Sequence, residues 1–128
     1  EFHPVHHPGL TYGFKIKTPH QTIGYVSDNE IKREHSQALI DFYQGVDLLI
    51  HEAQYLPQEY LHKKGWGHTS LSEAIQFVNA VKPGKWFVIH HDPSHTDEDL
   101  FAMQQEARRS ALCCPVEWIG DGSILKID

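Results

Sequence analysis

Lys85-Trp86-Phe87-Val88-Ile89-His90-His91-Asp92 joins a short apolar run to a cluster of polar side chains. A run of this length after the Pro83-Gly84 turn signal predicts a buried strand over residues 85–90. A histidine where such a strand ends is held on rigid backbone and faces a loop. This stretch therefore predicts both a central strand and one side of a functional site.

Polar side chains also stand at the ends of three other predicted strands. They are His7 before Tyr12-Phe14-Ile16, Asp28 after Gly24-Tyr25-Val26, and His51-Glu52 after Leu48-Leu49-Ile50. Imidazole and carboxylate groups are the ligands that divalent transition metals prefer. Their convergence at strand ends favours a metal-assisted hydrolytic site over a packed core.

Length and composition limit the class of protein. The 128 residues predict a single domain over 1–128, and the formal net charge of −6, with eleven neutral histidines, argues against broad binding to nucleic acid or an anionic membrane. No run of 18 apolar residues occurs, so we expect no membrane span, and no signal peptide opens the chain. The adjacent Cys113 and Cys114 favour free thiols in a reducing, cytoplasmic compartment.

Strand and helix signals alternate along the chain. The patterns predict strands over 12–16, 21–26, 46–50, 85–90, 116–119 and 123–127, and helices over 31–43, 71–81 and from Thr96 to about 109. Ser70 with Glu73 predicts a capping box for the second helix, and Asp121-Gly122 predicts a hairpin turn near the end. Alternation favours an α/β fold, and the hairpins at both ends indicate a mixed, α+β-like sheet.

Five segments together resemble the metallo-β-lactamase superfamily. His7-Pro8-Gly9, Tyr25-Val26-Ser27-Asp28 and Val88-Ile89-His90 are similar to its third, fourth and last metal motifs. His51-Glu52-Ala53 and Gly67-His68-Thr69-Ser70 are similar to paired segments of its ribonuclease Z-like and phosphodiesterase-like branch. The resemblance extends from about His7 to Asp97, and the segments follow one another in the expected order.

The resemblance implies a dinuclear hydrolase. His7 and His90 would each bind one of two divalent metal ions and Asp28 would bridge them, with Zn²⁺ favoured and Fe or Mn as alternatives. Metal-bound hydroxide would then cleave a phosphodiester or a related ester bond. The resemblance also implies that Glu52 orients His68, which donates a proton to the leaving group.

Each assignment has a simpler alternative. Strand alternation lets only one of His90 and His91 face the site, and the spacing to Asp97 selects His90 while His91 stays open. Asp28 would otherwise cap the following helix, and Glu52 with His68 would otherwise form an ordinary ion pair. Trp66 either lines a pocket or packs its own loop. The remaining histidines are expected to face solvent, namely His3, His6, His20, His35, His62 and His95.

One feature of the superfamily is missing. No His-x-His-x-Asp-His motif precedes His7, so the chain is expected to be the C-terminal half of the four-layer αββα sandwich, without its upstream half. Each metal would then keep one histidine and the shared Asp28, whereas catalytic zinc sites have three protein ligands. We therefore expect weak metal binding and little activity in isolation. The uncovered apolar sheet face predicts a homodimer or a strand-exchanged dimer.

The sequence is also compatible with other functions. The same fold serves a non-catalytic binding or regulatory module, a thioester hydrolase or a di-iron redox enzyme, and a structural domain with incidental histidines is the simplest case. The acidic charge makes a small-molecule phosphodiester a better substrate than bulk RNA, unless basic surface is confined elsewhere in the protein.

Overall fold

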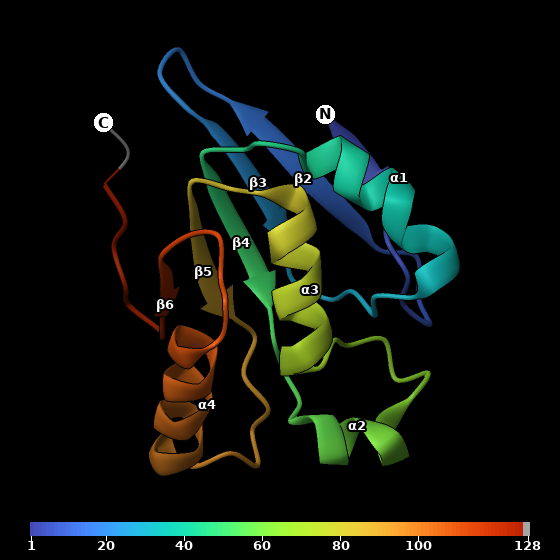
Figure 1. The fold of residues 1–128 in the computed structure, drawn as a ribbon. Coiled ribbons are helices and arrows are strands. Elements are labelled where there is room, and N and C mark those ends of the chain that lie inside the picture. Colours follow the sequence, from blue (N-terminus) through green and yellow to red (C-terminus); the bar gives the residue numbers. More distant parts are fainter. Residues whose placement is uncertain (127–128) are drawn as a thin grey trace.

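The computed structural model describes residues 1–126 and contains a six-stranded mixed sheet with four helices (Figure 1). The strands are β1 (Phe2–Pro4), β2 (Tyr12–Lys17), β3 (Thr22–Val26), β4 (Leu48–Glu52), β5 (Lys85–Ile89) and β6 (Val116–Trp118). The helices are α1 (Arg33–Tyr43), α2 (Pro57–Lys63), α3 (Leu71–Val81) and α4 (Asp97–Arg109). The predicted α/β class with a mixed sheet is confirmed.

The order of the strands in space follows their order in the sequence. β1, β2 and β3 form an antiparallel meander, whereas β3, β4, β5 and β6 run parallel. In the parallel part Val26 lies beside His51, and His51 lies beside Val88. The carboxyl ends of β3, β4 and β5 therefore meet at one edge of the sheet, where open α/β sheets bind their ligands.

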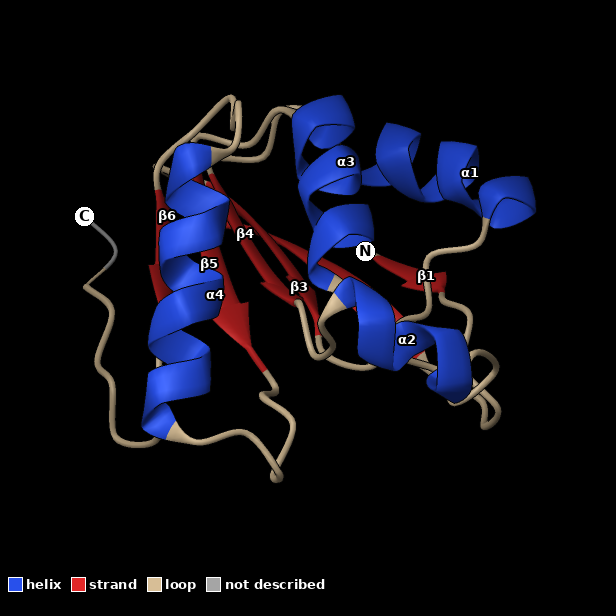
Figure 2. Cartoon of the chain, turned by 60° about the horizontal axis from the view of Figure 1, so that its bottom comes forward, coloured by secondary structure: helices blue, strands red, loops and turns tan. Residues whose placement is uncertain are grey.

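The helices α1, α3 and α4 cover one face of the sheet, while α2 lies beyond the strand ends (Figure 2). Tyr43 of α1 is fully buried there, and its hydroxyl donates to the Tyr25 carbonyl. A Cβ at Gly13 or Gly24 would collide with the Tyr43 ring, so the two glycines allow this helix to approach closely. The core between the layers includes Val26, Leu49, Leu71, Val78, Trp86, Val88 and Met103.

The opposite face of the sheet exposes large apolar side chains. Because Gly13 and Gly24 face the helices, strand alternation turns their neighbours to the other side. These neighbours are Tyr12, Phe14, Ile16 and Tyr25, which are 38–51% exposed, and Phe2 stacks edge-on against Tyr12. We call this set, with Phe2, the open apolar face.

Capping residues in the sequence correctly predicted where α3 and α4 begin. Ser70 caps α3 by accepting from the Glu73 amide, and Glu73 accepts in return from the Ser70 amide. Thr96 and Asp99 form the same capping box at α4. Both helices have the predicted bounds, because a capping box satisfies backbone groups that any helix start leaves unpaired.

The structure corrects the predicted C-terminal hairpin. The turn at Asp121-Gly122 is present, but residues 123–126 form no strand, and Ile127 lies outside the described residues. β6 pairs with β5 alone among the described strands. A turn is determined by a few neighbouring residues. A strand that follows it also needs side chains whose contacts across the strands stabilise the pairing. The short strand β1 and the helix α2 were not expected from the sequence, and β4 begins two residues later than predicted.

Within residues 1–126 no helix combines the length and apolar character that a bilayer crossing requires. Cys113 and Cys114 are both free thiols, as the sequence predicted.

Candidate functional site

Three predicted site residues stand at the carboxyl ends of neighbouring parallel strands. Asp28 follows β3 by two residues, Glu52 is the last residue of β4, and His90 comes directly after β5. His7 and His68 reach the same edge from the loops before β2 and α3. The rings of His7 and His68 lie 5.5 Å apart, and those of His68 and His90 lie 4.9 Å apart. The fold therefore brings all five predicted residues into one cluster.

The Asp28 carboxylate lies between two imidazoles. Its Oδ2 is 3.9 Å from Nε2 of His7, and its Oδ1 is 3.5 Å from Nε2 of His90. Both distances exceed a normal hydrogen bond, and each oxygen faces a different ring. All three side chains are partly exposed, between 23% and 37%, so a solvated ion has access to them.

Glu52 and His68 form a close pair behind this group. Oε1 of Glu52 lies 3.2 Å from Nδ1 of His68 and also accepts from the Asn29 amide at 2.7 Å. The Glu52 side chain is fully buried, whereas His68 is 15% exposed. The carboxylate is thus held inside the fold, and the imidazole lies between it and the open site.

Burial and the pair interaction move both pKa values. Burial raises the pKa of Glu52 to about 7, although the hydrogen bonds from His68 and Asn29 oppose the rise. Burial lowers the pKa of His68, but the hydrogen bond and the charge of Glu52 outweigh it, so the pKa lies above its ordinary value. Both shifts favour a proton on this pair. Such a pair is suited to proton donation.

The backbone separates His90 from His91. His90 has a positive φ of 56°, a conformation that is strained for a residue with a Cβ and is common at functional sites. Its ring faces Asp28, whereas Nε2 of His91 lies 2.9 Å from the Ile119 carbonyl on another side. His90, and not His91, therefore lies beside Asp28.

Gln54 supports His90, and no sequence pattern indicated this contact. Its side-chain amide lies 3.1 Å from Nδ1 of His90 and 3.3 Å from the His90 carbonyl. The same amide nitrogen makes both contacts, and because the carbonyl can only accept, this nitrogen also presents a donor to Nδ1. Nε2 of His90 is left toward the site, 3.5 Å from Asp28.

Glu30 is a second residue that the sequence did not indicate. It is 1% exposed and accepts from the Tyr60 hydroxyl at 2.8 Å and from the amides of Gly65 and Gly67 at 2.8 and 3.2 Å. Burial raises its pKa, but these hydrogen bonds outweigh burial and lower it. Glu30 therefore ties the loop before His68 to α2.

Gly67 sets the approach of that loop to His7. Its φ is 94°, and a Cβ there would collide with the His7 ring and with Pro8. A glycine is needed on both counts, because other residues rarely adopt this φ and none would fit the space. Trp66, next to it, is 60% exposed, so Trp66 does not pack the loop down.

Two ion pairs join α2 to the loop after β5. Lys63 Nζ lies 2.7 Å from Asp92 and 4.4 Å from the centre of the Tyr55 ring, and the His95 ring lies 3.0 Å from the Glu59 carboxylate. The side chain of His95 is only 5% exposed, so the expectation that it faces solvent was wrong. An acidic partner 36 residues away explains the burial.

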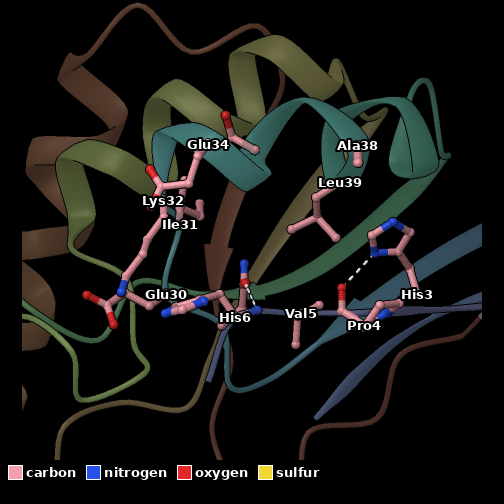
Figure 3. Close-up of a pocket in the computed structure, with 12 residues that line it drawn as sticks. His3, Pro4, Val5, His6, Glu30, Ile31, Lys32, Glu34, Ala38 and Leu39 are labelled. Carbon is pink, nitrogen blue, oxygen red and sulfur yellow. Dashed lines mark hydrogen bonds between the residues drawn. The ribbon is translucent and has the colours of Figure 1, made fainter. Parts of the chain in front are cut away.

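A cavity of about 310 Å³ adjoins the cluster on the side of α1 (Figure 3). Residues 3–6 line one wall, and residues 29–32 and parts of α1 line the other. Figure 3 shows His3 and His6 along one wall and Glu34 and Lys32 along the other. Its lining includes Glu30 but none of the five predicted site residues.

The donor groups of the site fit divalent metal ions. Asp28 presents separate oxygens to His7 and His90, as a carboxylate shared by two ions would, and imidazole and carboxylate ligands suit Zn²⁺, Mn²⁺ or Fe²⁺. Glu52 and His68 add a proton-holding pair beside them. The arrangement thus combines candidate metal ligands with a proton-holding pair, and metal-assisted hydrolysis uses both.

Comparisons with known sequences agree with the predicted family. Residues 1–91 match a family model described as a beta-lactamase superfamily domain. A ribonuclease Z of Brevibacillus brevis is 31% identical over 94 residues, which make up 71% of this chain and 30% of that protein. A ribonuclease Z of an Exiguobacterium species is 33% identical over 72 residues, which make up 56% of this chain and 23% of that protein.

Comparisons with solved structures agree on the fold. The metallo-beta-lactamase fold protein YhfI of Bacillus subtilis superposes with a TM-score of 0.78 at 20% identity, over 95% of this chain and 46% of that one. The short form of human tRNase Z superposes with a TM-score of 0.71 at 17% identity, over 99% of this chain and 42% of that one. The chain thus spans less than half of these structures and less than a third of the two ribonuclease Z sequences.

Proposed function

Because this chain belongs to the beta-lactamase superfamily, in its ribonuclease Z-like branch, we propose that it forms part of a metal-dependent hydrolase that cleaves phosphodiester bonds. The observation that carries the proposal is the position of Asp28, whose two oxygens face Nε2 of His7 and Nε2 of His90. A purely structural ion pair would close one of these gaps to hydrogen-bond length, whereas both distances leave room for an ion.

In this proposal His7, Asp28 and His90 hold two divalent ions, with zinc preferred. When bound, such ions polarise a phosphoryl oxygen and lower the pKa of a water molecule to about 7. Asp28 supplies negative charge to both positions, and the neutral imidazoles add none. Gln54 keeps the His90 ring in place, and Gly67 leaves the space that the His7 ring occupies.

The protein's own acid–base chemistry is assigned to Glu52 and His68. Glu52 stabilises the protonated imidazole from a buried position, and His68 donates its proton from Nε2 to the oxygen of the leaving group. Asn29 holds the carboxylate oriented, because its amide donates to the same oxygen that contacts His68. The pair loses its proton as the ester bond breaks and recovers it from solvent.

We propose that the complete site takes further ligands from outside this sequence. Three ligands leave each ion with one histidine and the shared carboxylate, which is fewer than catalytic zinc sites have. We propose that the chain is the C-terminal portion of an αββα sandwich and that the other portion covers the open apolar face. The chain covers less than half of each of the two structural neighbours, which supports this arrangement. Without the other portion, we expect the chain to have little activity.

The substrate proposed is RNA or a smaller phosphodiester. The names of the relatives, ribonuclease Z and tRNase Z, favour RNA, whereas the net charge of −6 favours a smaller ester unless basic surface lies elsewhere in the protein. The free thiols of Cys113 and Cys114 fit a reducing compartment such as the cytoplasm.

The test is hydrolysis by the protein that carries this domain. We expect bis-p-nitrophenyl phosphate to be cleaved when Zn²⁺ or Mn²⁺ is present, with a model thioester as the comparison substrate. Glu52→Gln should lower kcat by roughly 10²–10⁴-fold, because it removes the charge that stabilises protonated His68. Asp28→Ala should abolish activity together with metal binding.

His62→Gln is the matched control, since His62 is an exposed histidine of α2 outside the site. It should leave the rate unchanged. Cleavage of the thioester alone, or wild-type rates in Asp28→Ala, would exclude the proposed function.

A further inference from the structure

Two adjacent thiols lie at the edge of the sheet opposite to the candidate site. Cys113 and Cys114 belong to the loop between α4 and β6 (Figure 1). Val116, the first residue of β6, pairs with Trp86 near the start of β5, whereas His90 follows the end of β5. The thiols are therefore separate from the five residues of the candidate site, and the proposed function does not use them.

Hydrogen bonds hold this loop on both sides of the thiols. The Asn79 side chain of α3 accepts from the Cys113 amide at 2.9 Å and donates to the Ala111 carbonyl at 3.0 Å. The Pro115 carbonyl accepts from the Trp86 amide at 3.0 Å. The backbone that carries the thiols is thus ordered before any ligand binds, which reduces the conformational entropy that binding would cost.

The two thiols lie close enough to influence each other. Cys113 is exposed, and its thiol donates to the Val78 carbonyl at 3.6 Å. Cys114 is half-buried against the core and lines a hollow of about 270 Å³. Burial raises the pKa of Cys114 to about 12, and the charge and hydrogen bond of Cys113 add to the rise. Two thiolates here would repel each other, and a cation between the sulfurs would remove that repulsion.

A disulfide between these adjacent residues is a poor alternative. The described peptide bonds are all trans, so the two Cα atoms lie about 3.8 Å apart. Disulfides usually join Cα atoms that are roughly 4.4–6.8 Å apart, and departures from this range are strained. An ion bound between the sulfurs avoids this strain, because it lets them stay farther apart than a direct bond would.

Two sulfur ligands favour a soft monovalent ion over zinc. Structural zinc sites have four ligands and catalytic sites have three from protein. Within residues 1–126, no cluster of three or more His, Cys, Asp or Glu ligands includes either cysteine. Soft thiolates suit Cu(I), which is stable with two of them. We propose that Cys113 and Cys114 form a binding site for one Cu(I) ion.

Charge at this position fits the proposed complex. Each thiol gives its proton to solvent and forms one copper–sulfur bond, and the oxidation state of the copper does not change. One monovalent cation with two thiolates carries net negative charge, and Arg108, which lines the hollow beside Cys114, supplies positive charge to balance it. Because protons are displaced, binding should strengthen as the pH rises.

The experiment is an anaerobic competition for Cu(I) between the 128-residue chain and bicinchoninate, whose copper complex is coloured. We expect the wild type to remove one ion per chain from the dye. Cys113→Ser should weaken binding by at least about 100-fold, since losing a group that only supports a ligand already costs roughly 10–100-fold. Cys114→Ser should have the same effect.

The matched control keeps the number of thiols but separates them. Cys114→Ser combined with Ser123→Cys places the second thiol at an exposed position beyond β6. This separated-thiol variant should bind as weakly as Cys114→Ser alone. X-ray absorption at the copper edge is a second readout and should show two sulfur ligands in the wild type only. Circular dichroism checks folding, and Cys113→Ser, at an exposed residue, keeps the test valid if Cys114→Ser does not fold.

Three results would overturn the inference. Wild-type affinity in Cys113→Ser would place the ion on other residues, such as the histidines. Wild-type affinity in the separated-thiol variant would show that the adjacent position of the thiols does not matter. A wild type that takes no copper from the dye would exclude the site. The proposed function is decided separately by hydrolysis in the complete protein, where Cys113→Ser should leave the rate unchanged.

Discussion

His51 shows how a single buried residue can make the stability of this fold depend on pH. Its ring is fully buried against Phe77, with Nδ1 donating to the Glu52 carbonyl and Nε2 accepting from the Asn29 side chain. Both nitrogens are therefore satisfied in the neutral form, and a second ring proton would face the donor amide of Asn29. Burial lowers the pKa of His51 to about 4, although the Glu52 carbonyl opposes this.

The expected consequence is a loss of stability in mild acid. Between the unfolded pKa of about 6.5 and the folded value near 4, the unfolded chain binds a proton that the folded chain does not. Stability due to His51 is thus complete above pH 6.5 and falls as the pH drops toward 4. When the pH is lowered from 7.5 to 5, the free energy of unfolding should fall by about 2 kcal/mol more in the wild type than in His51→Asn.

Urea denaturation at the two pH values measures this difference. The comparison with His51→Asn is needed because the raised pKa of Glu52 acts in the opposite sense over the same range. His20→Asn, at an exposed turn, should keep the wild-type pH dependence. Identical pH dependence in the wild type and His51→Asn would show that the ring takes up its proton freely in the folded state.

At the scale of elements, one carboxylate holds the segment that carries His68. Glu30 joins the Tyr60 hydroxyl of α2 to the amides of Gly65 and Gly67. An amide cannot accept from all these donors, since one of its two polar atoms is itself a donor. The loop over 64–68 is thus stabilised by charge from a different part of the chain.

Glu30→Gln should lower the free energy of unfolding by roughly 1–3 kcal/mol, because a buried donor is left unpaired. It should also speed tryptic cleavage after Lys64, which is exposed in this loop. Urea denaturation and limited proteolysis measure the two effects. Glu34→Gln, at an exposed position of α1, is the matched control. Unchanged stability and cleavage would mean that the loop is held by other contacts.

At the scale of the whole molecule, the sheet has helices on one face only. The open apolar face includes Phe14 and Ile16 of β2 and Tyr25 of β3, with exposed fractions of 45%, 51% and 38%. Contiguous exposed apolar surface of this kind marks an interface. In the isolated chain we expect a second copy to cover it.

Size-exclusion chromatography with light scattering should show a dimer at high concentration. The double variant Phe14→Glu and Ile16→Glu should be monomeric with an unchanged circular dichroism spectrum, because charge on this face opposes association. Leu61→Glu, at an exposed apolar residue of α2, should remain dimeric. A monomeric wild type at high concentration would count against this interface.

Sequence patterns predicted the parts of the fold that depend on near neighbours. α3 and α4 begin at the capping boxes of Ser70 and Thr96, whose partners lie three residues away. The buried strand over 85–89 and the polar residue that ends it were also visible, because burial on both faces requires a continuous apolar run. Five motifs in order were enough to indicate the family, which is now confirmed.

Partners that lie far apart in the sequence were not predictable in this way. Glu30, Gln54 and His95 are ordinary polar residues by composition, and each is set by a contact 30 or more residues away. The predicted hairpin at Asp121-Gly122 was wrong for the same reason. Its turn depends on neighbouring residues, but its second strand would need a partner strand in the sheet. α2 was also missed, because the residue before it, Leu56, has no side chain that could cap a helix.

The sequence by itself determined which chemical groups stand at the strand ends, because a buried strand and the residue that follows it are a local pattern. Only the tertiary structure decided how those groups face one another. The parallel register of β3, β4 and β5 sets Asp28 between two imidazoles and places the buried Glu52 carboxylate against His68. Distances between side chains depend on the packing of whole elements, which no stretch of neighbouring residues encodes alone.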